Sequence, residues 1–87
     1  MILELTKNFA KEYSNLPRKF QERVDLALKL FLENKYNPIL RNHALKGNYK
    51  GFSSISAGGD IRIHYYEKGD KITIVLVRVG SHSQLYK

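Results

Sequence analysis

The sequence predicts an α+β domain of order β-α-α-β-β-β, with two N-terminal helices on one face of a mainly antiparallel four-stranded sheet. Two observations predict this class. Apolar residues recur at helical spacing between Phe20 and Phe31, in the first half of the chain. The second half holds three strand-sized runs, which the turn sequences Gly58-Gly59 and Lys68-Gly69-Asp70 separate. Helices followed by a run of strands are typical of α+β proteins.

The N-terminal part is expected to form a short strand and two helices. Met1–Leu5 is mostly apolar and suits an edge or sheet-joining strand. Thr6 is a suitable N-cap for the first helix, and Pro17 suits the first turn of the second. The residue before Pro38 avoids helical conformation, so residues 35–42 are expected to be a connection. The second helix is indicated by an amphipathic stripe of Phe20, Val24, Ala27, Leu28 and Phe31.

The three later strands are expected at about Lys50–Ala57, Asp60–Glu67 and Lys71–Val79. Gly58-Gly59 can adopt the positive φ angles of a tight hairpin turn. Apolar residues on both sides of the third strand predict a central position in the sheet. Gly80 ends that strand, and Ser81–Lys87 is expected to be a loop or short turn.

Alternation along the middle strand divides its side chains between two faces. Ile61, Ile63 and Tyr65 should pack beneath the helices. The polar residues of the strand should face away from the helices, and Ser54 and Ser56 join them if the register allows. This polar face can equally be an ordinary solvated surface with a cross-strand charge pair. Its strand residues are Asp60, Arg62, His64 and Tyr66.

The composition limits the classes of protein to which this chain can belong. Eighty-seven residues without cysteine are expected to form one domain, residues 1–87, in a reducing compartment. No apolar run approaches the ~18 residues of a membrane span, and the start lacks the pattern of a signal peptide, so a soluble cytoplasmic protein is expected. The net charge of +7 favours a polyanion or an acidic protein partner, but it does not identify nucleic acid.

The chemistry-bearing residues fit no common cofactor motif. His43 precedes the three-strand segment and His82 follows it, so folding can bring two proton carriers together. The His-x3-His spacing and the cysteine partners of a zinc site are absent, as are the phosphate-binding loop and the Gly-x-Ser-x-Gly elbow. We therefore expect no metal and no cofactor.

Several short motifs in the second half resemble the RelE/ParE toxin superfamily, and within it the YafQ-like branch of bacterial toxin–antitoxin modules. This resemblance covers about half the chain. It implies a sequence- or codon-influenced mRNA endonuclease that works on the ribosome and is neutralised by a cognate antitoxin, with operator DNA bound only through the antitoxin. The motifs are His43-Ala44-Leu45-Lys46-Gly47, Tyr49-Lys50-Gly51-Phe52, Asp60, Tyr65 and Gly80-Ser81-His82-Ser83-Gln84-Leu85-Tyr86.

The resemblance also implies roles for individual residues. His43, Asp60 and His82 match the catalytic positions of the family. Arg62 matches a strand arginine that contacts the scissile phosphate, and Tyr86 matches an aromatic residue that supports the site.

The chain departs from the family pattern at Ser56, where the branch has a histidine, and at Ile61, where it has tryptophan. Serine cannot exchange a proton at neutral pH as imidazole does. Three outcomes are therefore open: His64 substitutes from the neighbouring strand, the site works with fewer groups, or it is catalytically weak.

The expected reaction uses the 2′-hydroxyl of RNA as the nucleophile, so no covalent protein nucleophile is needed. His43 and His82 are the acid and base, without assignment, and Asp60 orients a histidine or acts as the base. Arg62 clamps the phosphate with its fixed donors. Lys46 and Lys50 hold flanking phosphates, and Tyr49 stacks on a base or, preferably, packs the end of the sheet.

Two other functions share this fold. One is a ParE-like toxin that poisons DNA gyrase, and the other is a catalytically weak homologue that only binds an antitoxin. The endonuclease hypothesis expects His43, His82, the Asp60 carboxylate and Arg62 to meet in one pocket on the helix-free face of the sheet. It is refuted if His43 and His82 point to opposite sides of the molecule.

Overall fold

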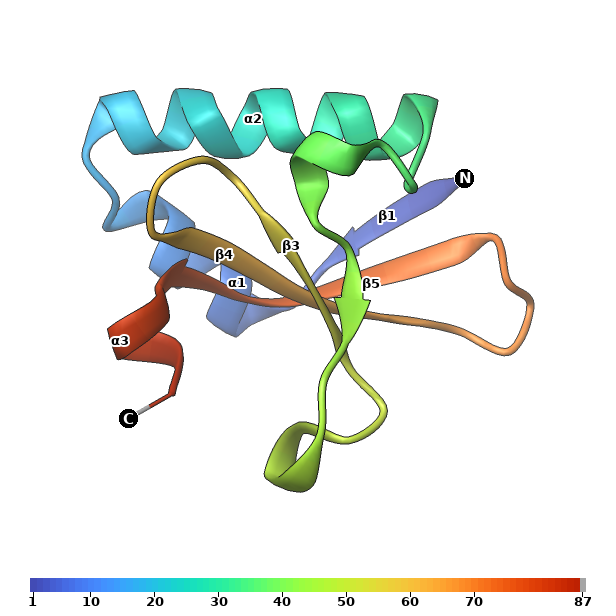
Figure 1. Ribbon diagram of the computed structural model, residues 1–87. Helices are drawn as coiled ribbons and strands as arrows, with labels where there is room; N and C mark the ends of the chain where they lie inside the picture. Colours follow the sequence, from blue (N-terminus) through green and yellow to red (C-terminus); the bar gives the residue numbers. More distant parts are fainter. Residues whose placement is uncertain (87) are drawn as a thin grey trace.

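The computed structural model describes residues 1–86 and contains a five-stranded sheet of order β1-β5-β4-β3-β2, with helices packed on it (Figure 1). The predicted α+β class and the element order of the first half are confirmed. The elements are β1 (Ile2–Leu5), α1 (Lys7–Ser14), α2 (Arg18–Glu33), the 3-10 turn η1 (Pro38–Leu40), β2 (His43–Ala44), the 3-10 turn η2 (Gly47–Tyr49), β3 (Ser53–Ser56), β4 (Ile61–Glu67), β5 (Thr73–Ser81) and α3 (His82–Leu85).

The sheet has one strand more than expected. β2 pairs antiparallel with β3, with His43 opposite Ser54 and Ala44 opposite Ser53. A strand of two residues has no visible alternation, so only its partner in the folded chain defines it. β5 lies between β1, with which it pairs parallel, and antiparallel β4, which confirms its predicted central position.

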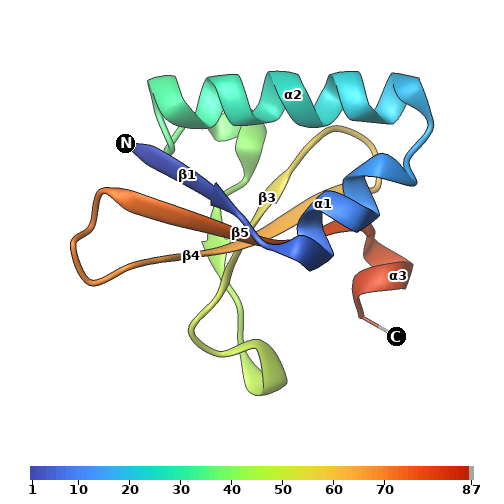
Figure 2. The same cartoon turned by 180° about the vertical axis from the view of Figure 1, so that it is seen from behind.

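The helices begin and pack largely as their sequences indicate. The Thr6 hydroxyl accepts a hydrogen bond from the Phe9 amide at 3.1 Å, which confirms the predicted N-cap. Pro17 is the N-cap of α2 rather than a residue of its first turn. Figure 2 shows α1 alongside β5 and α2 across the sheet. Phe9 and Phe31 from these helices are buried in one core with sheet residues such as Ile63.

The predicted alternation along β4 holds on the core side, where Ile61, Ile63 and Tyr65 are buried. The interpretation of the opposite side as an ordinary solvated surface fails at His64, which is only 1% exposed. Tyr49 of η2 and Tyr86 at the end of α3 pack against the His64 ring and cover this part of the sheet. Asp60 precedes the strand and lies in the turn between β3 and β4, one residue before the start of β4.

A β-bulge changes the pairing of β4 with β5. His64 lies opposite Arg78, but Tyr65 lies opposite Leu76, so Val77 is an extra residue in β5. An extra residue turns two successive side chains towards the same side of a sheet. Val77 and Arg78 accordingly line one pocket together with His64.

The C-terminal segment contains the short helix α3 instead of an irregular tail. Ser81 and Gln84 form a reciprocal capping box, with N···O distances of 2.8 and 3.1 Å. Leu85 is buried and anchors the helix against the sheet. Lys87 lies outside the described residues. Among the helices of residues 1–86, none has both the length and the apolar character that a membrane span requires.

Candidate active-site cleft

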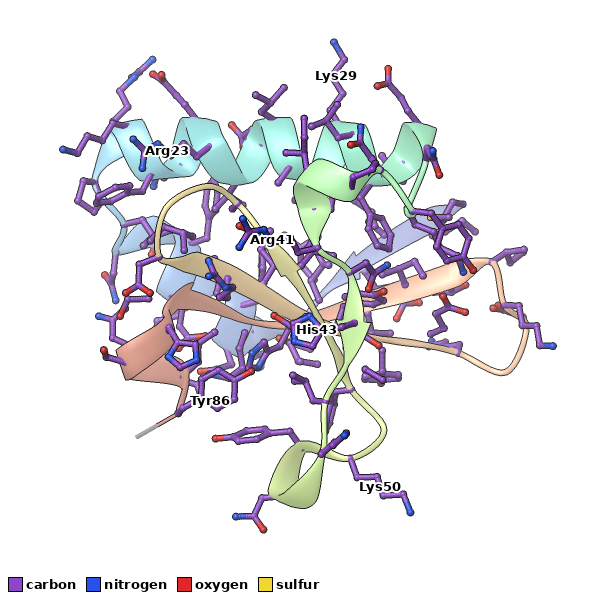
Figure 3. All side chains as sticks on the ribbon, viewed as in Figure 1. Arg23, Lys29, Arg41, His43, Lys50 and Tyr86 are labelled. Atoms are coloured by element: carbon purple, nitrogen blue, oxygen red, sulfur yellow. The ribbon has the colours of Figure 1, made fainter. Side chains whose placement is uncertain are left out.

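A cleft of about 310 Å³ lies on the side of the sheet away from α2 and gathers side chains from four segments of the chain. Figure 3 shows His43 on β2, with Arg41 above it and Tyr86 below it to the left. Four residues of the predicted site, and Ser56, are brought together here. The lining residues are Arg41, His43, Ser54, Ser56, Arg62, His82 and Tyr86.

His43 is held in one tautomer by the backbone that precedes it. Its Nδ1 lies 2.8 Å from the carbonyl oxygen of Arg41. A carbonyl oxygen only accepts hydrogen bonds, so in the neutral ring Nδ1 bears the proton and Nε2 keeps its lone pair. Arg41 itself has a φ of 50°, a left-handed conformation that is uncommon outside glycine. This imidazole is therefore prepared to accept a proton through Nε2.

His82 is positioned by the start of α3. Its amide donates a hydrogen bond of 2.9 Å to the carbonyl oxygen of Asp60. Its ring lies 4.5 Å from the ring of Tyr86, one helical turn later. Burial raises the pKa of the Tyr86 hydroxyl, with a smaller contribution from Tyr49, so Tyr86 stays protonated at neutral pH.

The structure does not bring the side chain of Asp60 into this cleft. Asp60 is exposed in the turn before β4 and lines a different pocket, together with Phe20 and Gln84. This pocket lies between α2, α3 and the loop that joins α1 to α2. Its contact with the site is the main-chain bond to His82. The cleft is therefore lined by His43, His82 and Arg62, and the Asp60 carboxylate is not among its lining groups.

Arg62 is fixed by the turn between β3 and β4. Its Nη1 donates to the carbonyl oxygens of Gly59 at 2.8 Å and Ile61 at 3.0 Å, and to the Ser56 hydroxyl at 3.4 Å. Ser56 also accepts from the amide of Gly58 at 3.2 Å. Ser56, at the position of the family histidine, thus supports the turn and the guanidinium. A guanidinium anchored through one nitrogen can offer its other donors to a phosphate.

The charge of the cleft favours an anion. Two guanidinium groups, those of Arg41 and Arg62, line it, and no carboxylate is among its lining residues within positions 1–86. Anions are attracted into a recess lined by one sign of charge. The cleft is therefore suited to an anionic group such as a phosphate.

His64 lies beneath the cleft and does not line it. Burial, and to a lesser extent the positive charge of Arg78, lowers the pKa of His64 from 6.5 to about 4. The ring is therefore neutral at pH 7. Its Nε2 and the hydroxyl of Ser54, its neighbour across β3 and β4, are buried without a hydrogen-bond partner in the described residues. These features do not support His64 as the replacement for the missing family histidine.

An aromatic cluster supports the C-terminal helix. The ring of Tyr49 lies 5.8 Å from His64 and 5.4 Å from Tyr86, and His64 lies 5.3 Å from Tyr86. The Tyr49 hydroxyl donates to the Leu85 carbonyl oxygen at 2.8 Å. These contacts favour the packing role for Tyr49 over stacking on a base within the cleft.

The two lysines expected to hold flanking phosphates lie outside the cleft. Lys46 and Lys50 are exposed on either side of η2, and Figure 3 shows Lys50 near the tip of this loop. They can contact only the part of an RNA chain that extends beyond the cleft.

Sequence reasoning missed Arg41, although a cation two residues before His43 is a signal, because its left-handed backbone cannot be seen in the sequence.

Possible metal ligands do not cluster in the part of the chain that the structure describes. Within residues 1–86, no group of three or more histidine, aspartate or glutamate side chains is arranged to hold a metal ion. The two cleft imidazoles are accompanied by arginines and hydroxyl groups, which are not the usual partners of histidine in a zinc site.

Comparisons with known proteins identify the family and support the fold. The family profile "Bacterial toxin of type II toxin-antitoxin system, YafQ" matches residues 1–87. The fold is similar to that of YafQ from E. coli strain BL21(DE3), with a TM-score of 0.81, 16% identity, and coverage of 98% of this chain and 97% of that one. It is also similar to a chain of the E. coli DinJ–YafQ toxin–antitoxin complex, with a TM-score of 0.78, 17% identity, and coverage of 98% of this chain and 96% of that one.

A third structure has a more similar sequence. A copper-bound mutant of a toxin from Helicobacter pylori is 30% identical, with a TM-score of 0.70 and coverage of 98% of both chains. No match was found among curated protein sequences.

Proposed function

Because this chain belongs to the YafQ family of toxins from bacterial type II toxin–antitoxin systems, we propose that it is a metal-independent endonuclease that cleaves mRNA on the ribosome in the cytoplasm. One observation carries the proposal: His43 and His82 line the same cleft as Arg62. Two imidazoles and a fixed guanidinium are the groups needed to move two protons and stabilise a phosphorane. RNA supplies the nucleophile itself.

The geometry allows the two histidines to be given separate roles. Nε2 of His43 takes the proton from the 2′-hydroxyl as the new bond from 2′-oxygen to phosphorus forms, since Nδ1 is occupied by Arg41. Arg62 stabilises the charge that develops on the phosphorane oxygens. His82, in its protonated form, donates a proton to the departing 5′-oxygen as the bond from phosphorus to that oxygen breaks. The products are a 2′,3′-cyclic phosphate and a 5′-hydroxyl.

The remaining predicted residues support this reaction from a distance. The main-chain carbonyl of Asp60 holds the amide of His82, so we assign Asp60 a positioning role. Tyr86 supports the His82 ring, and Ser56 steadies Arg62. Lys46 and Lys50 bind phosphates outside the cleft through long-range attraction.

The cognate antitoxin is the second partner in this proposal. DinJ is the antitoxin in the solved E. coli complex with YafQ. With a net charge of +7, this chain is suited to an acidic segment that folds upon binding. Operator DNA is bound only through that antitoxin.

Purified protein, ribosomes and a defined message test the activity directly. His82→Ala should reduce the cleavage rate at least ~10²-fold, because it removes the proton donor. The control is Lys29→Ala, an exposed change on α2 that Figure 3 shows pointing away from the cleft, and it should cleave like the wild type. A message with 2′-deoxyribose at the mapped cut site should remain intact. Equal rates for wild type and His82→Ala would exclude this mechanism.

The alternative is a ParE-like toxin that acts on DNA gyrase, and the serine at position 56 is the observation in its favour. Expression in cells distinguishes the two functions. An endonuclease stops translation first, whereas a gyrase poison changes plasmid supercoiling while translation continues.

A further inference from the structure

A second pocket, of about 340 Å³, lies between the start of α1 and the loop that carries η2, and the reaction described above does not use it. It adjoins the cleft, because Tyr49 in its wall contacts Tyr86, which lines the cleft. The lining residues are Thr6, Asn8, Tyr49, Phe52, His64, Val77 and Arg78.

The walls of this pocket are mainly apolar and aromatic, and Arg78 is the one charged residue among the lining residues within positions 1–86. Tyr49 and Phe52 come from the loop and supply the aromatic surface, while His64 of β4, which is neutral and only 1% exposed, forms the buried floor. The bulge in β5 adds Val77 to the same side. Aromatic and apolar surfaces of this kind accept planar rings, and single-stranded RNA is bound by stacking its bases on such side chains.

The rim of the pocket carries polar groups in fixed positions. Arg78 is held by a bidentate ion pair with Glu12, in which Nη2 lies 2.8 Å and Nε 3.1 Å from the carboxylate oxygens. This leaves Nη1 of Arg78 as a donor. Asn8 donates from Nδ2 to the Val77 carbonyl oxygen at 3.3 Å, which leaves Oδ1 as an acceptor. A fixed donor and a fixed acceptor beside a flat apolar recess can read the edge of a base.

We propose that this pocket binds the base of a nucleotide next to the scissile phosphate and so determines the base preference of cleavage; the proposal rests on the proposed function. The spacing is suitable. His43, Ser54, His64 and Arg78 occupy matching positions on β2, β3, β4 and β5. Adjacent strands lie ~4.8 Å apart, so the floor of the pocket lies roughly 10 Å from His43. A strand of RNA lying in the cleft can therefore place a neighbouring base in the pocket.

Binding is tested without any cleavage, by following the amide signals of the protein in NMR titrations. The ligands are AMP, GMP, CMP, UMP and ribose 5-phosphate, which carries the sugar and phosphate but no base. We expect the nucleotides to shift the signals of Asn8, Phe52 and Val77, with one base binding most tightly. Ribose 5-phosphate should shift only signals of the cleft, such as those of Arg62 and His82. If it shifts the pocket signals equally, or if no nucleotide shifts them, the proposal is wrong.

Two variants test the pocket further. Asn8→Ala is exposed and should weaken binding of the preferred nucleotide ~5–10-fold through one lost hydrogen bond. Phe52→Leu should weaken it at least ~5-fold through lost stacking. The control is Asn48→Ala, an exposed asparagine in η2 that does not line the pocket, and it should leave binding unchanged.

Mapping of cut sites separates this proposal from the proposed function. On ribosome-bound message, Asn8→Ala and Phe52→Leu should redistribute the cuts among sites, and Asn48→Ala should not. If the wild type cuts but both pocket variants keep its nucleotide affinity and its cut sites, the base-binding proposal fails alone. If the wild type does not cut RNA but binds nucleotides in the pocket, the endonuclease function fails and the binding site remains.

Discussion

The buried ring of His64 should make the stability of the protein depend on pH, and His64→Phe should remove this dependence. Burial is the main cause that lowers the pKa of His64 from 6.5 to about 4, so the unfolded chain binds a proton more tightly than the folded chain. The free energy of unfolding is then highest above pH 6.5 and decreases as the pH falls from 6.5 towards 4. This pKa difference lowers the free energy of unfolding by about 3 kcal/mol at a pH below both pKa values, and by about 2 kcal/mol at pH 5.

Phenylalanine is a suitable replacement because the ring environment is aromatic. The His64 side chain is 1% exposed between Tyr49 and Tyr86, and its Nε2 has no hydrogen-bond partner among residues 1–86. Replacing an unpartnered polar ring by an apolar ring of similar shape is nearly neutral or stabilising at pH 7. The variant should therefore fold, and it should lose less stability than the wild type on acidification.

Urea unfolding at pH 7 and pH 5 measures the effect. Between these values the wild type should lose about 2 kcal/mol more than His64→Phe, which corresponds to roughly 1–2 M in the urea midpoint. Other acid-sensitive groups are common to both proteins and cancel in the comparison. Asn48→Ala, at an exposed and non-titratable residue of η2, is the control and should retain the wild-type pH dependence. If wild type and His64→Phe lose equal stability, His64 is not held neutral by burial.

Two further predictions concern carboxylates that lie outside the cleft. Glu12→Gln should lower the free energy of unfolding by about 1–3 kcal/mol, because it weakens charge-assisted bonds to Arg78, and thermal or urea unfolding measures the loss. Asp60→Ala should keep the ribosome-dependent cleavage rate within about threefold of wild type, whereas His82→Ala loses ~10²-fold, because Asp60 holds His82 through a main-chain carbonyl that alanine also has.

Each of these has a matched control. Glu22→Gln removes an ion pair with Arg18 whose side chains are 69% and 91% exposed, and it should change stability by less than about 1 kcal/mol. A loss at Glu12 no larger than at Glu22 would contradict the role of its ion pair. For Asp60, a loss as large as that of His82→Ala, in a variant that unfolds like the wild type, would restore the carboxylate as a catalytic group.

The local features of the fold were predictable because they depend on neighbouring residues. The helical spacing from Phe20 to Phe31 and the cap at Thr6 are properties of short segments, and both are confirmed. The capping box of α3 was missed although Ser81 and Gln84 have its spacing, because a four-residue helix forms only when tertiary contacts such as that of Leu85 support it.

The candidate site, too, was predictable only in those features that depend on short motifs and residue spacing. The motifs around His43 and His82 indicated the toxin family, and the family match confirms that resemblance. Alternation along β4 placed Arg62 on the face away from the helices. The direction of the Asp60 side chain depends on the turn that joins β3 to β4, and the left-handed backbone of Arg41 depends on its connection to β2, so neither followed from a pattern of residue types.

The amino-acid sequence by itself determined which of the longer segments are helical or extended, which face of β4 is polar, and to which family the chain belongs, because these follow from residue spacing and short motifs. Only the tertiary structure decided that His64 is buried and neutral, that Asp60 contacts the site through its carbonyl group, and that a second pocket opens beside the cleft. These properties arise from contacts between residues such as Tyr49, Arg78 and Tyr86, which are distant in the sequence and meet only when the sheet, the η2 loop and the C-terminal helix pack together.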